Sequence, residues 1–154
     1  MNIIEQEQAL TVVGIELRTT NEDAFQTIPA HWARFSQQAV ASRVPGRLSD
    51  DVYAVYTHFQ NAGRNNLGLY SLVIGPAVAA SAAVPEGLVR VVVPASRRAV
   101  FPVAPGRPDL VGAAWQAIWQ RTDLRKTFIA EYEHYRADGQ IEILVGLQPA
   151  GAAE

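Results

Sequence analysis

Apolar and polar positions alternate near the start of the chain. Between residues 11 and 19, the apolar residues Val13, Ile15 and Leu17 are each separated by one residue of another kind. This period of two predicts a strand with one buried face. Short apolar runs predict further strands at 52–59, 69–75, 88–93 and 97–103, and a strand hairpin at 127–147.

Two other stretches have the longer period of a helix. In the stretch 28–41, Trp32, Phe35 and Ala39 recur at helical spacing, and Pro29 suits a first helical turn. The stretch 110–120 predicts an amphipathic helix for the same reason. Its apolar positions are Leu110, Ala114, Trp115, Ile118 and Trp119.

The chain reads as two copies of one unit. The run VYAVYTHF at 52–59 resembles TFIAEYEHY at 127–135, so that Tyr56 aligns with Tyr132 and His58 with His134. Each run follows a helical stretch and leads through a turn into a second apolar strand. The sequence therefore predicts an α+β fold of two β-α-β-β units related by a pseudo-twofold axis, with a cleft at the seam.

The two copies differ at one position that carries chemistry. In this alignment Thr57 is aligned with Glu133, so only the second copy has a carboxylate in the middle of an aromatic strand. Side chains of a strand alternate between its faces, which puts Glu131, Glu133 and Tyr135 together on one face. Tyr132 belongs to the other face.

A carboxylate in an apolar groove is a candidate binding site for cations. Burial penalises its charged form and raises its pKa, and an incoming cation relieves that penalty. Aromatic walls add a cation–π attraction of about 1–2 kcal/mol. In the alternative interpretation, Glu133 pairs with an arginine or lies on a solvated face. Glu131 and Glu142 remain alternatives for the carboxylate of the groove, because a shift of one residue in the strand pairing would favour them.

Composition narrows the classes of function. The 154 residues carry a net charge of −2 without a basic block, so nucleic acid is not an expected partner. The chain has no cysteine, which excludes disulfides and thiol chemistry, and its three histidines lack the spacing of metal ligands. We therefore expect no metal and no cofactor. Without a signal peptide pattern or a long apolar run, the sequence predicts a cytoplasmic protein that does not cross a membrane.

An ordered set of motifs resembles a known family. The motifs are Val13-Gly14-Ile15, the hairpin 52–56 with 68–75, the stretch 91–101 followed by Trp115, the aromatic-Glu-x-Tyr run at 132–135, and the last strand at 141–147. The chain resembles the GyrI-like, or AraC-type, effector-binding domain, and in particular the free-standing integron-associated effector-binding proteins. Two departures bear on the shape of the pocket: the strand around Arg97 and Arg98 lacks the usual aromatic residue, and the segment 119–128 is short.

The resemblance implies a fold and a ligand class. It implies two β-α-β-β units in a curved antiparallel sheet, with two main helices and a central ligand groove. The domain would span 1–147, with half-units at about 1–76 and 88–147, followed by a disordered tail at 148–154. Members bind lipophilic, often cationic, small molecules beside a buried glutamate. The candidate ligand contacts here are Glu133, Tyr135, Trp32, Phe35, Tyr53, Tyr70, Phe101 and Trp115, although core packing also explains the aromatic residues.

Three classes of function follow, and we favour the first. The protein binds lipophilic or cationic small molecules, for sensing or sequestration, and a role related to transcription belongs to this class. Alternatively, it is a hydrolase of reactive lipophilic natural products that uses Glu133 as a general acid or base. The third class is an interaction protein, for example an inhibitor of a larger enzyme. A protein partner or a homodimer stays open.

Overall fold

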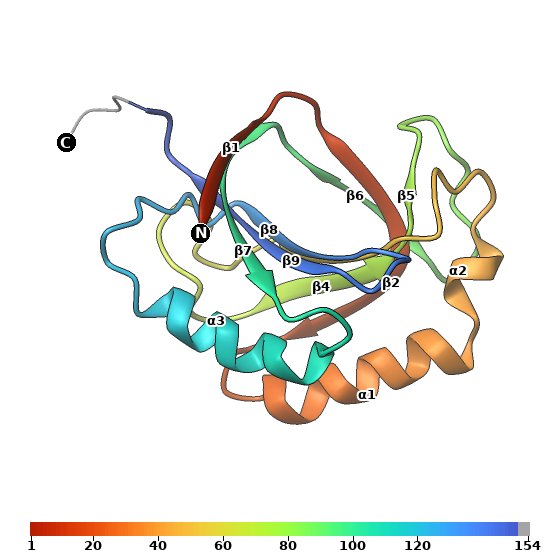
Figure 1. Ribbon diagram of the computed structural model, residues 1–154. Coiled ribbons are helices and arrows are strands. Elements are labelled where there is room, and N and C mark those ends of the chain that lie inside the picture. The colour runs from red at the N-terminus through yellow and green to blue at the C-terminus, as the bar shows by residue number, and fades with distance from the viewer. Residues whose placement is uncertain (151–154) are drawn as a thin grey trace.

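The computed structural model describes residues 1–150 as a strongly curved antiparallel sheet with helices on one side (Figure 1). The strands pair in the order β1-β7-β9-β8-β3-β4-β2-β5, and β6 also pairs with β2. The strands are β1 (Asn2–Gln6), β2 (Leu10–Thr19), β3 (Val52–Thr57), β4 (Tyr70–Gly75), β5 (Ala77–Val78), β6 (Val89–Val93), β7 (Ser96–Val103), β8 (Ala130–Tyr135) and β9 (Ile141–Leu147). The helices are α1 (Ala24–Gln37), α2 (Val40–Arg43), the 3-10 turn η1 (Pro108–Leu110) and α3 (Val111–Trp119).

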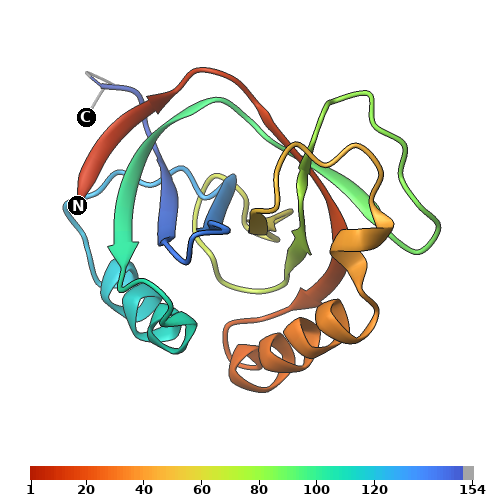
Figure 2. The ribbon, with the colours of Figure 1, turned by 45° about the vertical axis from the view of Figure 1, so that its right-hand side comes forward.

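The strand order confirms the prediction of two β-α-β-β units. Strands β3 and β8 pair at the centre of the sheet, β4 and β2 continue it on one side, and β9 and β7 continue it on the other. The unit β2-α1-β3-β4 and the unit β7-α3-β8-β9 therefore occupy matching places. As expected for such a pair, α1 and α3 lie on the same side of the sheet (Figure 2).

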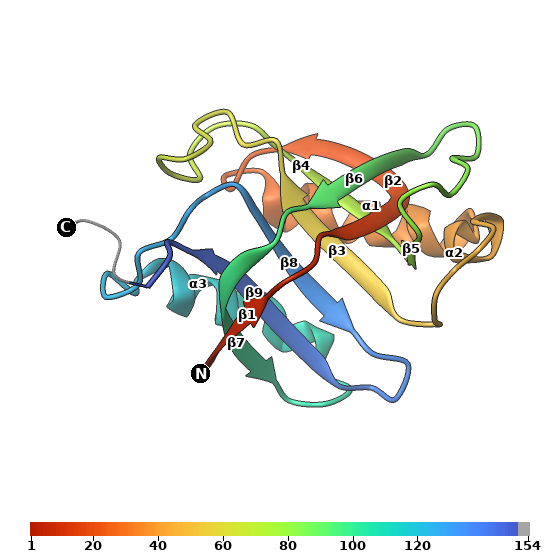
Figure 3. The same cartoon turned by 90° about the horizontal axis from the view of Figure 1, so that it is seen from above.

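The two units are also tied together at their outer strands. Strand β1 continues into β2, and β6 continues into β7, so that two long bent ribbons run side by side (Figure 3). Strand β1 pairs with β7, and β2 pairs with β6. The sheet thus curls around a buried apolar cluster that includes Val12, Val55, Val73, Val93 and Leu144.

The helices pack on the other face of the sheet. Helix α1 covers a buried group formed by Ala54, Leu72 and Ile74, while Trp115 and Ile118 of α3 pack on β9. His31 is fully buried and its Nε2 donates to the carbonyl of Ile15 at 2.9 Å, which fastens α1 to β2.

Several boundaries differ from the predicted ones. Helix α1 begins at Ala24, four residues before the predicted start, so that Pro29 lies inside the helix and not in its first turn. The predicted single helix is broken at Ala39, whose φ of 47° lies in the left-handed region. Strands β1 and β5 were not predicted.

The predicted register of the repeat is wrong. Tyr56 lies on the helix side of the sheet, whereas Tyr132 belongs to the apolar cluster on the opposite side. A rotation about an axis through the sheet keeps the faces distinct, so these two tyrosines cannot be equivalent. Thr57 likewise does not correspond to Glu133, because its hydroxyl turns away and donates to the carbonyl of Ile129. The counterpart of Glu133 on β3 must share its face.

Candidate functional site

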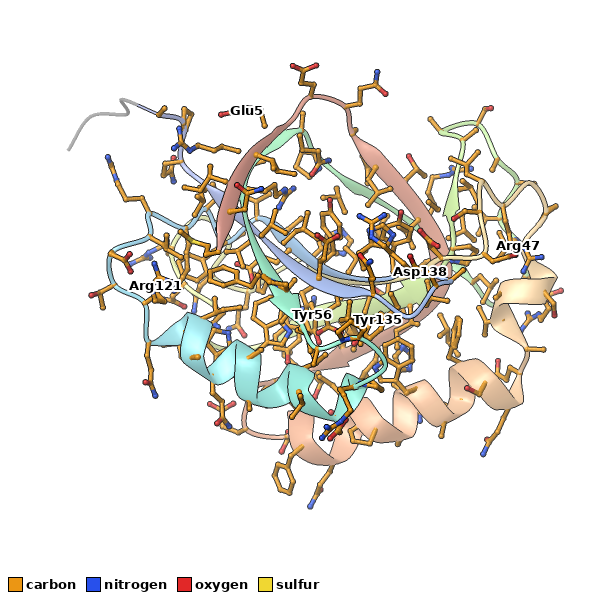
Figure 4. All side chains as sticks on the ribbon, in the orientation of Figure 1. Glu5, Arg47, Tyr56, Arg121, Tyr135 and Asp138 are labelled. Carbon is orange, nitrogen blue, oxygen red and sulfur yellow. The ribbon has the colours of Figure 1, made fainter. Side chains whose placement is uncertain are left out.

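A cavity of about 790 Å³ lies between α1, α3 and the sheet. Figure 4 shows Tyr56 and Tyr135 in this region, between the strands and the two helices. Apolar and aromatic side chains dominate the walls, and three acidic residues, Asp109, Glu131 and Glu133, also line it. Its lining includes Phe25, Ile28 and Trp32 from α1, Val111, Trp115 and Trp119 from α3, and Val52, Tyr56, Tyr70, Glu131, Glu133 and Tyr135 from the strands.

Glu133 is the most enclosed polar group of the cavity, with 1% of its surface exposed. Its carboxylate accepts three hydrogen bonds: from the Tyr56 hydroxyl at 2.6 Å, from Trp115 Nε1 at 2.6 Å and from the Tyr135 hydroxyl at 2.5 Å. Burial raises the pKa of Glu133, while these hydrogen bonds act in the opposite direction. The three hydrogen bonds stabilise the ionised form, whereas burial, the larger effect, favours the neutral form.

The two tyrosines that contact Glu133 keep their protons. Burial and the neighbouring charge of Glu133 raise the pKa of Tyr56 and of Tyr135 far above the ordinary value. Both hydroxyls therefore remain donors at any physiological pH. Because Tyr56 comes from β3, Trp115 from α3 and Tyr135 from β8, the carboxylate is oriented by both half-units together.

Aromatic rings continue outward from this carboxylate. Trp32 meets the ring of Tyr135 edge-on, with centroids 5.1 Å apart, and Tyr56 meets Trp115 in the same way at 5.3 Å. Trp119 extends the wall from Trp115 at 6.4 Å. The site thus combines an anion with ring faces and edges on several sides, an arrangement that suits an organic cation.

Glu131 is a second buried acid in the same cavity. It lies two residues before Glu133 on β8, opposite Tyr56 of β3, and 5% of its surface is exposed. Burial raises the pKa of Glu131 to about 7, although the charges of Lys126 and Arg98 act against this shift. Sequence alone left Glu131 as an alternative to Glu133, and the structure places both at the cavity.

Comparison with known proteins identifies the family. The family described as integron-associated effector binding protein matches residues 3–147. The chain belongs to this family. The match confirms the resemblance found in the sequence, and it makes this chain an effector-binding protein of the integron-associated type. No protein with a curated description matches the chain significantly.

Solved structures agree on the fold. An integron cassette protein from Vibrio cholerae superposes with a TM-score of 0.74 and 22% identity, over 96% of this chain and 95% of that protein. The protein SAV2435, solved with bound tetraphenylphosphonium, superposes with a TM-score of 0.76 and 17% identity, over 96% of this chain and 93% of that protein. At these identities the likeness shows a shared fold.

The cavity of this effector-binding protein collects five of the eight predicted contact residues. Glu133, Tyr135, Trp32, Tyr70 and Trp115 all line it. The alternative interpretation, an ion pair between Glu133 and an arginine, does not describe the contacts that Glu133 makes, because its three donors are two tyrosines and a tryptophan.

The structure places the other three predicted residues away from the cavity. Phe35 packs behind Trp32, at a centroid distance of 5.8 Å, against the core between α1 and the sheet. Tyr53 lies on the opposite face of β3, where it stacks on His134 at 4.3 Å. Phe101 packs beside the α3 cluster, with the Arg121 guanidinium 5.9 Å from its ring. We therefore remove Phe35, Tyr53 and Phe101 from the proposed contacts.

Glu142, the other alternative carboxylate, and His134 lie outside this cavity. Glu142 pairs with Arg136 at 2.8 Å and borders a second cavity, of about 490 Å³, on the other face of the sheet. His134 shares that face and its Nε2 lies 2.7 Å from the carboxylate of Asp51. Within residues 1–150, His, Asp and Glu form no cluster that could hold a metal ion, and no helix is long and apolar enough to cross a membrane.

Sequence reasoning missed Tyr56, which donates directly to Glu133. The signal was present, because Val52, Ala54 and Tyr56 alternate along β3 and all share one face. That face could be assigned only after β3 had been paired with β8 in the correct register. Trp119, an apolar position of the predicted amphipathic helix, is 42% exposed and lines the cavity.

Proposed function

We propose that this effector-binding protein takes lipophilic organic cations into the cavity between α1 and α3, with Glu133 as the charge partner. The observation that carries the proposal is an almost fully buried carboxyl group, 1% exposed, whose three hydrogen-bond donors are all neutral. Neutral donors orient the carboxylate but leave its net charge in the cavity. A ligand that brings a positive charge supplies the missing counterion.

The aromatic lining explains why the cation should be lipophilic. A compact, strongly hydrated ion loses much solvation free energy when it enters an apolar cavity, whereas a cation whose charge is spread over rings loses far less. Such a ligand also gains contact with Trp32, Tyr56 and Trp115. The relative SAV2435, solved with tetraphenylphosphonium, supports this ligand class. We further propose that the protein senses or sequesters such compounds.

The contacts of Glu133 favour binding over catalysis. Three hydrogen bonds to the carboxylate occupy most of the acceptor positions through which a general base would take a proton. The hydrolase hypothesis therefore ranks second. Recovery of the ligand after prolonged incubation, with its mass unchanged, would agree with binding, whereas its conversion at substoichiometric protein would support hydrolysis.

A charge-specific loss of affinity tests the proposal. Titration calorimetry would compare tetraphenylphosphonium with the neutral triphenylphosphine oxide, using the wild type and Glu133→Gln. The cation should bind about 1–3 kcal/mol more weakly to the variant, because a charge-assisted contact is lost. The neutral compound should hardly change. Glu142→Gln serves as the matched control, since it removes a carboxylate outside the cavity. Equal losses for both ligands would indicate a defect of shape, and no loss would refute the role of Glu133.

A further inference from the structure

Two carboxylates share the same wall of the cavity. Glu131 and Glu133 are two residues apart on β8, face the same side and both line the cavity. A strand rises by about 3.3 Å per residue, so the two side chains leave the backbone about 7 Å apart. Both residues are buried, with exposed fractions of 5% and 1%. A single monovalent cation bound beside Glu133 does not neutralise the charge of Glu131.

The cationic side chains nearest to Glu131 are engaged elsewhere. Lys126 Nζ donates to the carbonyls of Ile118 and Arg121, at 2.8 and 3.0 Å, at the end of α3. Arg98 lies on the far side of the sheet, where its guanidinium stacks over the ring of Tyr132 at 5.4 Å. Its N–H groups donate to the carbonyls of Ala130 and Pro94 and to the side chain of Gln6. Neither cation lines the cavity.

Each carboxylate has its own aromatic surroundings. Glu133 lies beside Tyr135, which contacts Trp32. Glu131 lies opposite Tyr56, and from there the wall continues to Tyr70 at 5.8 Å and on to Phe59 at 5.9 Å from Tyr70. The cavity of about 790 Å³ is large enough for one ligand that extends along β8 past both acids.

We propose that the preferred ligands of this cavity are lipophilic dications whose two positive centres are about 7 Å apart, one beside Glu133 and the other beside Glu131. This inference rests on the proposed function and narrows its ligand class. A dication neutralises both buried carboxylates at once. The electrostatic attraction between its second charge and Glu131 is strongest where water is excluded.

Ethidium and propidium are suitable probes for the experiment. They share one fluorescent aromatic ring system, but propidium carries a second, quaternary ammonium group on a short arm. Fluorescence titrations at pH 8 and low salt would measure the affinity of both dyes for the wild type, Glu131→Gln, Glu131→Asp, Glu133→Gln and the control Glu142→Gln. A thermal melt of each variant shows whether it is folded.

The wild type should bind propidium at least about tenfold more tightly than ethidium, the ratio that corresponds to about 1.4 kcal/mol. Glu131→Gln should remove most of this preference by weakening propidium binding more than ethidium binding, and Glu131→Asp, which withdraws the charge by one methylene group, should reduce the preference in part. Glu142→Gln should retain it.

Absence of a preference in the wild type overturns the inference, even if a Glu131 variant fails to fold. A preference that survives in folded Glu131→Gln overturns it as well. Failure of the proposed function has a different signature: ethidium would bind equally well, or equally poorly, to the wild type and to Glu133→Gln.

Discussion

Ala54 and Glu133 are direct cross-strand partners on the central strands β3 and β8, on the face that carries the cavity. The methyl group of Ala54 is fully buried, and its small size leaves room above the strand beside the carboxylate. Paired residues in an antiparallel sheet have Cβ atoms about 5 Å apart, so any larger side chain at position 54 would compete with Glu133 and its donors for this space.

Ala54→Leu should therefore destabilise the protein and close the inner end of the cavity. Overpacking of a filled core costs about 1–3 kcal/mol, and the added methyl groups would displace Tyr56, Trp115 or Tyr135 from the carboxylate. Thermal melts and titration with tetraphenylphosphonium would show both effects. Ala117→Leu, on the exposed side of α3, is the matched control and should change stability by less than about 0.5 kcal/mol. Unchanged ligand affinity in Ala54→Leu would contradict this account of the cavity.

Tyr135→Phe should shift the pH profile of cation binding to higher pH. The substitution removes one of the hydrogen bonds that lower the pKa of Glu133, so that burial raises this pKa further. Since the cation needs the ionised carboxylate, binding should begin at a higher pH than in the wild type. Titrations from pH 5 to 8 would measure the shift. Tyr53→Phe, on the other face of β3, should leave the profile unchanged, and an identical profile for Tyr135→Phe would contradict the prediction.

Glu131→Gln should stabilise the protein, and the gain should increase with pH. Burial raises the pKa of Glu131 from 4.5 to about 7, so the folded state binds its proton more tightly than the unfolded state. The stability contributed by this group is thus complete below pH 4.5 and is lost as the pH rises to about 7. The variant escapes this loss, which amounts to about 3 kcal/mol. Urea denaturation at pH 5 and pH 8 would test it, and an equal gain at both would contradict the raised pKa.

Truncation after Leu147 should leave the fold intact. The backbone N–H of Gln148 donates to the carbonyl of Arg125 at 2.8 Å, whereas residues 149 and 150 are exposed. The remainder of the predicted disordered tail, residues 151–154, lies outside the described residues. We expect the melting temperature to fall by less than about 5 °C, which corresponds to roughly 1 kcal/mol. A larger decrease would show that the tail contributes to the packing of the domain.

The local patterns of the sequence predicted much of the site. Period-two alternation on β8 was enough to put Glu131, Glu133 and Tyr135 on one face, because side-chain direction in a strand depends only on residue parity. Helical spacing likewise assigned Trp32 and Trp115 to the two main helices. These inferences needed no knowledge of which strands become neighbours.

The features that the sequence did not predict correctly depend on the pairing of strands that are far apart along the chain. Aligning Tyr56 with Tyr132 matched identical letters but joined opposite faces of the sheet, and only the pairing of β3 with β8 reveals the error. Tyr53 and Phe101 were expected at the groove because they are aromatic residues on strands. Tyr53 lies on the opposite face of the sheet, whereas Phe101 lies on the helix side but packs beside the α3 cluster, away from the cavity. The short strand β1 has little local signal, since its partner lies almost a hundred residues further along the chain, with Asn2 opposite Val100.

This exchange of outer strands has a consequence for folding. Because β1 pairs with β7 and β2 pairs with β6, the first half-unit obtains its edge partners only after the second has been made. Loops that large close slowly, and contacts of such high sequence separation reduce the folding rate. During synthesis the N-terminal strand must therefore wait, with its hydrogen-bonding groups facing water, until the ribosome has released the segment around residue 100. The two half-units should consequently fold as one cooperative body, and neither should be stable when produced alone.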